Sequence, residues 1–286
     1  MKRYFCAVAF MALGLFCGTS NGQLEITLDV VQDAGYFGAG FNGDGVPSFA
    51  SQNMGAHTHA PVGKTHGDRL NRGAFQFDIA GLITSSAAVT GATFEFEVTV
   101  QGGPEGQEGV NFDLHRLLNE WDEGTGGSNV GEDTGDGITW ANATATDLRT
   151  KLGGDFEAMS LGATFVGGPD DYTISSDDLA SYVQNVLNGS TNDSGLLLKA
   201  NPETVDGSAA RVTTREANNG ARLVVQFNAT ILLADVNLDG GVNLLDVLPF
   251  IDRISNRIFQ FEADCNEDGT VDLLDVATFV QILQGK

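Results

Sequence analysis

Two related stretches of twelve residues close the sequence: Asp235-Val-Asn-Leu-Asp-Gly-Gly-Val-Asn-Leu-Leu-Asp246 and Asp264-Cys-Asn-Glu-Asp-Gly-Thr-Val-Asp-Leu-Leu-Asp275. In both, oxygen-bearing side chains fall at positions one, three, five, nine and twelve. Glycine stands at position six, where a calcium loop must turn sharply, and position seven supplies a backbone carbonyl. The pattern and its repetition predict two calcium loops rather than acidic surface turns.

The cofactor prediction is two calcium ions, one for each loop. The expected ligands of the first ion are Asp235, Asn237, Asp239, the carbonyl of Gly241, Asn243 directly or through water, and Asp246. The expected ligands of the second ion are Asp264, Asn266, Asp268, Thr270, Asp272 and Asp275.

An apolar segment follows each loop directly, which predicts two loop-helix repeats that bury their apolar faces against each other. The two segments contain Leu244, Leu245, Val247, Leu248, Phe250, Ile251 and Ile254, and then Leu273, Leu274, Val276, Phe279, Val280, Ile282 and Leu283. Pro249 falls inside the first of these helices. A kink or a delayed helix start is therefore expected there.

The duplicated Asp-x-Asn-x-Asp-Gly loop followed by a helix resembles a dockerin repeat. The resemblance implies a small calcium-binding module, here residues 235–286, that attaches secreted proteins to a cohesin-like partner. Aspartate at position twelve, Asp246 and Asp275, agrees with that family rather than with ordinary EF-hands. Positions ten and eleven, where dockerins contact their partner, are the pairs Leu244-Leu245 and Leu273-Leu274, which the sequence leaves open as partner contacts or core residues.

Residues 23–228 have the short apolar or alternating runs and glycine-rich turns that are typical of an all-β sandwich. In Thr93-Phe-Glu-Phe-Glu-Val98 the alternation is strict, so one face is predicted to be buried and the other solvated. With the strand that contains this segment, six strands are expected: Leu24 to Val31, Gly73 to Phe77, Ala92 to Val100, Asn111 to Leu117, Gly195 to Lys199 and Arg222 to Phe227.

A single helix is expected to interrupt these strands, capped by Ser176 and closed by Gly189, and packed on one end or edge of the sandwich. The fold prediction is therefore a mostly β chain. It comprises a jelly-roll-like β-sandwich with one short helix, a short linker at residues 229–234, and a small α-helical dockerin-type domain. The linker is short and apolar, so the two domains are expected to lie close together.

Four segments of the sandwich region carry a second resemblance: residues 69–78, residues 119–124 with 139–140, residues 194–199, and residues 214–217. Their order and spacing are similar to the secreted β-sandwich family named for its Asp-Asn-Arg-Leu-Arg-Glu motif, a relative of carbohydrate-binding modules. The resemblance implies a module that binds carbohydrate, with a polysaccharide as a possible partner, or that serves as a structural adhesion domain. Its pairing with dockerin-like repeats resembles exported proteins of planctomycete-type bacteria.

Trp121 and Trp140 are the candidate sugar-binding residues, because a pyranose stacks on an exposed aromatic ring. Structural packing at a strand end is the alternative interpretation. His57, His59 and His66 could form a transition-metal site or simply belong to an exposed polar loop.

The acidic stretch from Glu132 to Gly137 could hold a further calcium ion or be a solvated turn.

The first 22 residues have a basic start, an apolar stretch and a small polar end, the layout of a signal peptide cleaved near Gly22. Phe16 before Cys17 makes a lipid anchor the minor alternative. The mature chain would retain Cys265 alone, without an internal disulfide, and no integral membrane segment is expected in it. A secreted or cell-surface location follows.

The formal net charge of −23 repels nucleic acid, so no nucleic-acid partner is expected. Beyond the predicted signal peptide, the chain contains no nucleophile-elbow pattern, phosphate loop or His-Glu-x-x-His motif. The function prediction is a secreted, non-catalytic modular protein whose sandwich binds carbohydrate or acts in extracellular adhesion. A structural cell-surface protein without sugar binding and a polysaccharide-active enzyme are the alternatives.

Overall fold

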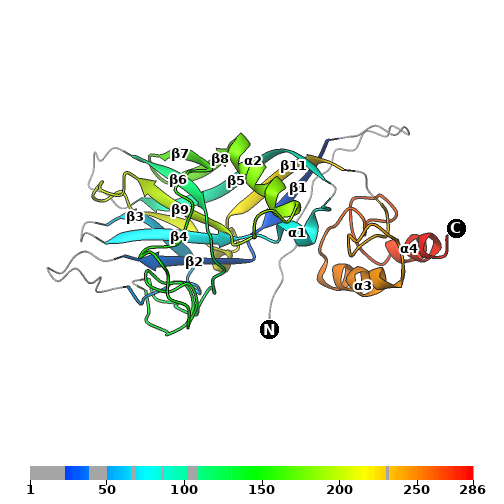
Figure 1. The fold of residues 1–286 in the computed structure, drawn as a ribbon, viewed down its shortest axis with the longest axis horizontal. Coiled ribbons are helices and arrows are strands. Elements are labelled where there is room, and N and C mark those ends of the chain that lie inside the picture. The colour runs from blue at the N-terminus through cyan, green and yellow to red at the C-terminus, as the bar shows by residue number, and fades with distance from the viewer. Residues whose placement is uncertain are drawn as a thin grey trace.

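The computed structural model of the chain describes residues 23–38, 50–65, 69–85, 87–101, 109–129, 131–229 and 232–285. Strands dominate up to residue 228, and a small helical unit follows (Figure 1). This is the mostly β architecture with a small helical end that the sequence predicts. The predicted signal peptide and its cleavage site near Gly22 lie outside the described residues. No described helix has both the length and the apolarity needed to cross a membrane.

The strands, in chain order, are β1 (Gln23–Asp29), β2 (Gln32–Phe37), β3 (His59–Lys64), β4 (Leu70–Gln76), β5 (Ala88–Gln101), β6 (Val110–Arg116), β7 (Gly162–Val166), β8 (Asp170–Ser175), β9 (Leu196–Asn201), β10 (Ala210–Thr213) and β11 (Arg222–Asn228). The helices are α1 (Ile79–Leu82), α2 (Asp177–Leu187), α3 (Val247–Asn256) and α4 (Asp275–Leu283). Two 3₁₀ turns are η1 (Arg215–Ala217) and η2 (Leu244–Asp246).

The strands form one curled sheet in the order β1-β11-β5-β10-β3-β4-β9-β6-β7, while β2 pairs with β4 and β8 pairs with β5. Strand β3 joins the two halves of the sheet. Its first residues pair with β10, and its last two, Gly63 and Lys64, pair with β4. Gly63 has φ of 105°, a conformation that strongly favours glycine, so this residue allows the strand to change partners.

The two halves of the sheet enclose the main hydrophobic core. Phe94 of β5 is fully buried and packs edge to face on Phe75 of β4, with ring centroids 5.4 Å apart. Phe96 and Val98 are also buried. The strict alternation in the sequence therefore marks the core face of β5, as predicted.

The six predicted strands correspond to β1, β4, β5, β6, β9 and β11. The predicted helix is α2, and the Ser176 hydroxyl caps it by accepting a hydrogen bond from the Leu179 amide at 3.0 Å. Helix α2 packs along β5, where the Gln184 side chain accepts a hydrogen bond from the Val89 amide at 2.8 Å. Strands β2, β3, β7, β8 and β10 and the single-turn helix α1 were not predicted.

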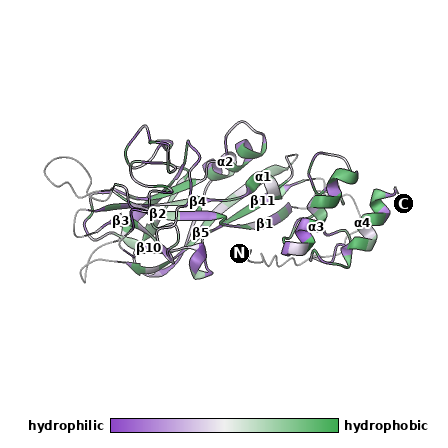
Figure 2. Cartoon of the chain, turned by 90° about the horizontal axis from the view of Figure 1, so that it is seen from below, coloured by the Kyte–Doolittle hydropathy of each residue, from purple (hydrophilic) through white to green (hydrophobic). Residues whose placement is uncertain are grey.

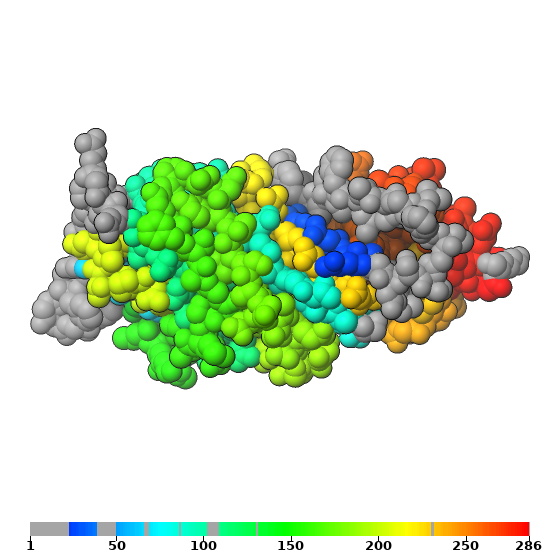
Figure 3. Space-filling view, turned by 90° about the horizontal axis from the view of Figure 1, so that it is seen from above, coloured from blue at the N-terminus to red at the C-terminus, as the bar shows by residue number. Residues whose placement is uncertain are grey.

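The helical unit lies against one end of the sandwich (Figure 3, orange to red). Phe261 packs edge to face on Phe227 of β11, with ring centroids 5.9 Å apart. The Arg253 guanidinium of α3 donates a hydrogen bond to the Gly81 carbonyl of α1 at 3.0 Å. The two units are therefore in contact, as the short apolar linker predicts.

We expect Phe94→Ala to lower the free energy of unfolding of the sandwich by about 3–5 kcal/mol, because it leaves a cavity between the two halves of the sheet. Phe165→Ala is the matched control, since Phe165 is 59% exposed, and its effect should stay within about 0.5 kcal/mol. Urea denaturation followed by tryptophan fluorescence measures both. Equal losses in the two variants would contradict the assigned core.

Candidate calcium loops

The first acidic stretch folds into a loop that closes on the carboxylate at its twelfth position. The two oxygens of Asp246 accept hydrogen bonds from the Asn237 amide at 3.0 Å and the Asn243 amide at 2.8 Å. Asp235 at position one accepts from the amides of Asp239 and Gly240 at 3.1 and 2.9 Å. The first and last aspartates thus both point into the loop.

The second stretch repeats these contacts at matching positions. Asp275 accepts from the Asn266 and Asp272 amides at 3.0 and 2.8 Å. Asp264 accepts from the amides at positions five and six of its loop at 3.0 and 2.8 Å. Gly240 and Gly269, at position six, have φ of 89° and 85°, the left-handed conformation that requires glycine at this turn.

The other predicted ligands lie around these aspartates. The Asn237 amide group donates to Asp239 at 2.8 Å, and the Asn243 amide group donates to the Gly241 carbonyl at 3.0 Å. In the second loop the Thr270 hydroxyl donates to Asp268 at 2.6 Å. The structure therefore brings the predicted ligands of each set together in one loop.

The backbone amides hydrogen-bond the carboxylates of these loops but do not balance their negative charge. Asp246 and Asp275 are fully buried, and Asp235 and Asp264 are 5% and 7% exposed. Burial raises the pKa of Asp264, and the negative charges of Asp275 and Asp268 add to the effect. Each loop is a cluster of oxygen donors with excess negative charge, which fits a hard cation such as Ca²⁺.

The two repeats share one apolar core. Phe250 of α3 stacks on Phe279 of α4, with ring centroids 3.9 Å apart and planes 5° apart. Val236 and Cys265 occupy matching loop positions and are both buried. Burial raises the pKa of the Cys265 thiol to about 12, so this cysteine serves as a small apolar side chain rather than a reactive thiolate.

Pro249 is accommodated by a delayed helix start. The turn η2 follows the first loop, and α3 begins at Val247, so the proline falls in the first turn of the helix. Amides in a first turn have no acceptor within the helix, and proline lacks that amide. The expected delay is observed.

The leucine pairs are not core residues. Leu244 and Leu245 are 77% and 68% exposed, and Leu273 and Leu274 are 76% and 68% exposed. Leu248, in the first turn of α3, is also 77% exposed. Of the two alternatives for the leucine pairs, the core alternative is therefore wrong, and Leu248 also departs from the expected burial between the repeats. We call these five side chains the exposed leucines. In Figure 2, α4 is mostly green (hydrophobic), whereas α3 combines green and purple residues.

The two tryptophans lie inside the sandwich. Trp121 is 5% exposed, and its indole N–H donates to the Ser194 carbonyl at 3.1 Å. Trp140 is 8% exposed, and the Arg72 guanidinium covers its ring at 4.6 Å. Sugar stacking requires an exposed ring face, so the structure contradicts an exposed platform at these positions and favours the packing alternative.

The histidine alternative finds no third ligand. The rings of His57 and His59 lie edge to face, with centroids 4.2 Å apart. Burial, and to a lesser extent the charge of His57, lowers the pKa of His59 to about 4. Within the described ranges, neither histidine belongs to a cluster of three metal-binding side chains. His66 lies outside those ranges.

The acidic stretch 132–137 is a hydrogen-bonded surface turn. Its carboxylates bind separate protein donors: Asp133 accepts from the Ser51 hydroxyl at 2.8 Å, and Asp136 accepts from the Thr125 hydroxyl at 2.9 Å. Because both carboxylates have their own donors and face solvent, the solvated turn accounts for them.

Sequence reasoning missed one group of carboxylates. Asp33, Glu123 and Glu216 have ligand atoms that all lie within 4.8 Å of one another, although they come from distant parts of the chain. Glu123 and Glu216 fall in segments that carry the second resemblance, but no local spacing connects them with Asp33.

Comparison with known families supports the assignment of the helical unit. The sequence model of the dockerin type I domain matches residues 233–284, a range that contains both loops and both helices. The match supports a calcium-dependent assembly module with a cohesin as its kind of partner. No curated protein matches the chain.

We expect Asp235→Ala and Asp264→Ala each to reduce the calcium bound per chain by one ion, because each removes a buried carboxylate at position one. Asp252→Ala is the control, since this α3 carboxylate is exposed and lies outside both loops. Isothermal titration calorimetry of the full chain gives the stoichiometry. An unchanged ion count in either loop variant would contradict the ligand assignment.

Proposed function

We propose that the chain is an exported, non-catalytic attachment protein. Its dockerin domain binds a cohesin-like protein when calcium is present, and its β-sandwich is the part that is thereby held at the partner. The observation that carries the proposal is the pair of matching loops, each with a leucine pair directed to solvent at positions ten and eleven.

The exposed leucines give this proposal its contact surface. Each leucine pair lies in a loop whose other side is filled by the aspartates that would bind the ion. Calcium therefore fixes the backbone that presents the leucines, and removing the ion would release it. Apolar side chains that protrude in repeated positions are typical of a protein-binding surface rather than of a solvated one.

A structural or adhesive role is the proposed function of the sandwich. The tryptophans that could stack on a sugar serve instead as internal packing. Two hollows among the described residues bear on the enzyme alternative. One is lined without any carboxylate, by residues such as Arg116 and Asn192, and the other borders Asp235 and Asp239 of the first calcium loop together with Glu262. Neither offers a separate pair of acids for glycoside hydrolysis.

Export agrees with the chemistry of the proposed module. Calcium sites in extracellular modules are filled at millimolar calcium, and the described part of the chain is stabilised without a disulfide, since Cys265 is free and buried. Calcium would then take the place that disulfides have in many exported domains.

We expect Leu244→Ser combined with Leu273→Ser to weaken binding to a cohesin domain by about tenfold or more, because both pairs lose apolar contact area. Calcium stoichiometry should stay unchanged, since neither leucine supplies a ligand. The measurement is biolayer interferometry of the full chain against a panel of purified cohesin domains, with calcium and with chelator.

Leu148→Ser combined with Leu152→Ser is the matched control, because these leucines are 77% and 62% exposed but belong to the sandwich. Control binding should equal that of the unsubstituted chain. Binding that persists in chelator, or an equal loss in the control, would refute the proposal. Absence of binding to every cohesin in the panel would refute the cohesin-like partner.

A further inference from the structure

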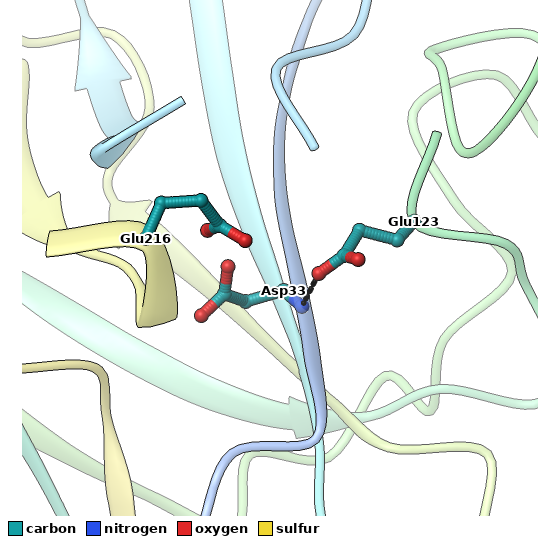
Figure 4. A group of neighbouring side chains, drawn as sticks. All are labelled: Asp33, Glu123 and Glu216. Carbon is teal, nitrogen blue, oxygen red and sulfur yellow. Dashed lines mark hydrogen bonds between the residues drawn. The ribbon is translucent and has the colours of Figure 1, made fainter. Parts of the chain in front are cut away.

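Three carboxylates from separate segments meet at one edge of the sandwich, away from the calcium loops. Asp33 comes from β2, Glu123 from the segment after Trp121, and Glu216 from the turn η1 (Figure 4). One ligand oxygen from each can be chosen so that all lie within 4.8 Å of one another. Oxygens that coordinate one Ca²⁺ at about 2.3–2.6 Å lie no more than about 5 Å apart, so the spacing suits a single ion.

Hydrogen-bond donors of the protein satisfy only some of the carboxylate oxygens in this group. Asp33 accepts a hydrogen bond from the Arg215 amide at 2.8 Å, and Glu123 accepts one from the Asp33 amide at 2.9 Å. The Arg215 guanidinium pairs with Glu123 and lies 3.2 Å from one oxygen of Glu216. One oxygen each of Asp33 and Glu216 remains buried without a hydrogen-bond partner in the protein.

The two unpartnered oxygens distinguish this group from an ordinary cluster of acidic side chains. Asp33 is fully buried, and Figure 4 shows its carboxylate and that of Glu216 turned toward each other. A buried carboxylate oxygen without a donor costs free energy, and two of them facing each other also repel. Native structures compensate such oxygens with a proton, a water or a cation.

The charge balance favours a cation. Three carboxylates face one guanidinium, so the group retains excess negative charge even with the Arg215 ion pairs intact. Burial raises the pKa of Asp33 well above its usual range, and the charges of Glu216 and Glu123 add to the effect. A divalent ion would neutralise the excess and let all three groups stay ionised.

We propose that Asp33, Glu123 and Glu216 bind one calcium ion that fastens β2, the segment around Glu123 and the turn η1 to one another. The donors are all carboxylate oxygens, which suit a hard cation and give no preference to zinc or copper. Glu123 and Glu216 have side chains that are 21% and 24% exposed, so the ion reaches the site from solvent. The site is independent of the dockerin domain and of its proposed partner.

The ion would replace a connection that the strands do not provide. Strand β2 pairs with β4 in one half of the sheet, whereas η1 lies between β10 and β11 of the other half. Glu123 lies in the long connection between β6 and β7, whose described residues form no long strand or helix. A shared ion would therefore couple the two halves of the sandwich to that connection.

The test uses the full chain with both loops disabled by Asp235→Ala and Asp264→Ala, so that a site in the sandwich is measured alone. We expect this chain to bind one calcium ion in isothermal titration calorimetry. Adding Asp33→Asn, or separately Glu216→Gln, should weaken that binding by about tenfold or more, because each removes a ligand charge. Adding Asp133→Asn, in the exposed acidic turn, should not change it.

Terbium luminescence supplies a second reading. Residues 232–285 contain neither tryptophan nor tyrosine, whereas Trp121 lies two positions before Glu123, and its carbonyl accepts a hydrogen bond from the Gln32 side chain at 2.6 Å. Terbium excited through tryptophan in the loop-disabled chain should therefore emit, and Asp33→Asn should abolish the emission. Calcium should displace the terbium.

Two results would overturn the proposal. One is a loop-disabled chain that binds no calcium. The other is an Asp33→Asn chain that binds calcium as tightly as the loop-disabled parent does. The first result would mean that a proton or a water, rather than a cation, compensates the buried oxygens. Because Glu216→Gln changes a partly exposed side chain, it keeps the test valid if the Asp33 variant does not fold.

Discussion

The helical unit depends on one constraint: its loops bury more negatively charged aspartates than they have positively charged partners. The chain has 38 acidic and 15 basic residues, and most acids can stay solvated. The aspartates at positions one and twelve of each loop cannot, because they are at most 7% exposed. Backbone amides orient these carboxylates but carry no net charge. We therefore expect folding of this unit to be coupled to binding of a cation.

The same constraint explains why the exposed leucines are exposed. In the first repeat, Asn243 caps the turn η2 and Asp246 ends it. The Asp246 carboxylate accepts a hydrogen bond from the Asn243 amide, and the Asn243 side chain accepts one from the Leu245 amide, so both side chains are held by backbone amides of the loop. A 3₁₀ turn has three residues per turn, so residues three apart lie on one side and the two between them lie on the other. Leu244 and Leu245 are those two residues. Holding the side chains at positions nine and twelve inside the loop thus directs positions ten and eleven to solvent.

The calcium loops could be predicted from the sequence because all their ligands lie within twelve consecutive residues. Strands such as β5 were also predictable, since their alternation records burial locally. Strand β2 was not, because Asp33, Gly35 and the polar Gln32 are poor strand formers, and its burial comes from neighbours far along the chain. The carboxylates around Asp33 escaped prediction for the same reason.

The tryptophans show the converse limit. Their residue type allows both an exposed platform and internal packing, and composition does not distinguish the two. Trp140 is packed internally because the Arg72 guanidinium covers its ring. Arg72 is itself held by an ion pair with Glu203 at 2.7 Å. A contact between such distant residues has no signature in local sequence.

The interface between the two units makes the dockerin domain a fixed extension of the sandwich. Arg253 binds Gln260 at 2.8 Å and the Gly81 carbonyl of the sandwich at 3.0 Å, and Phe261 packs against the main core. A flexible linker would let the domain bind its partner in any orientation relative to the sandwich. Here the helix that presents Leu248 also carries the contact with α1, so a partner bound at the exposed leucines would hold the sandwich in a defined direction.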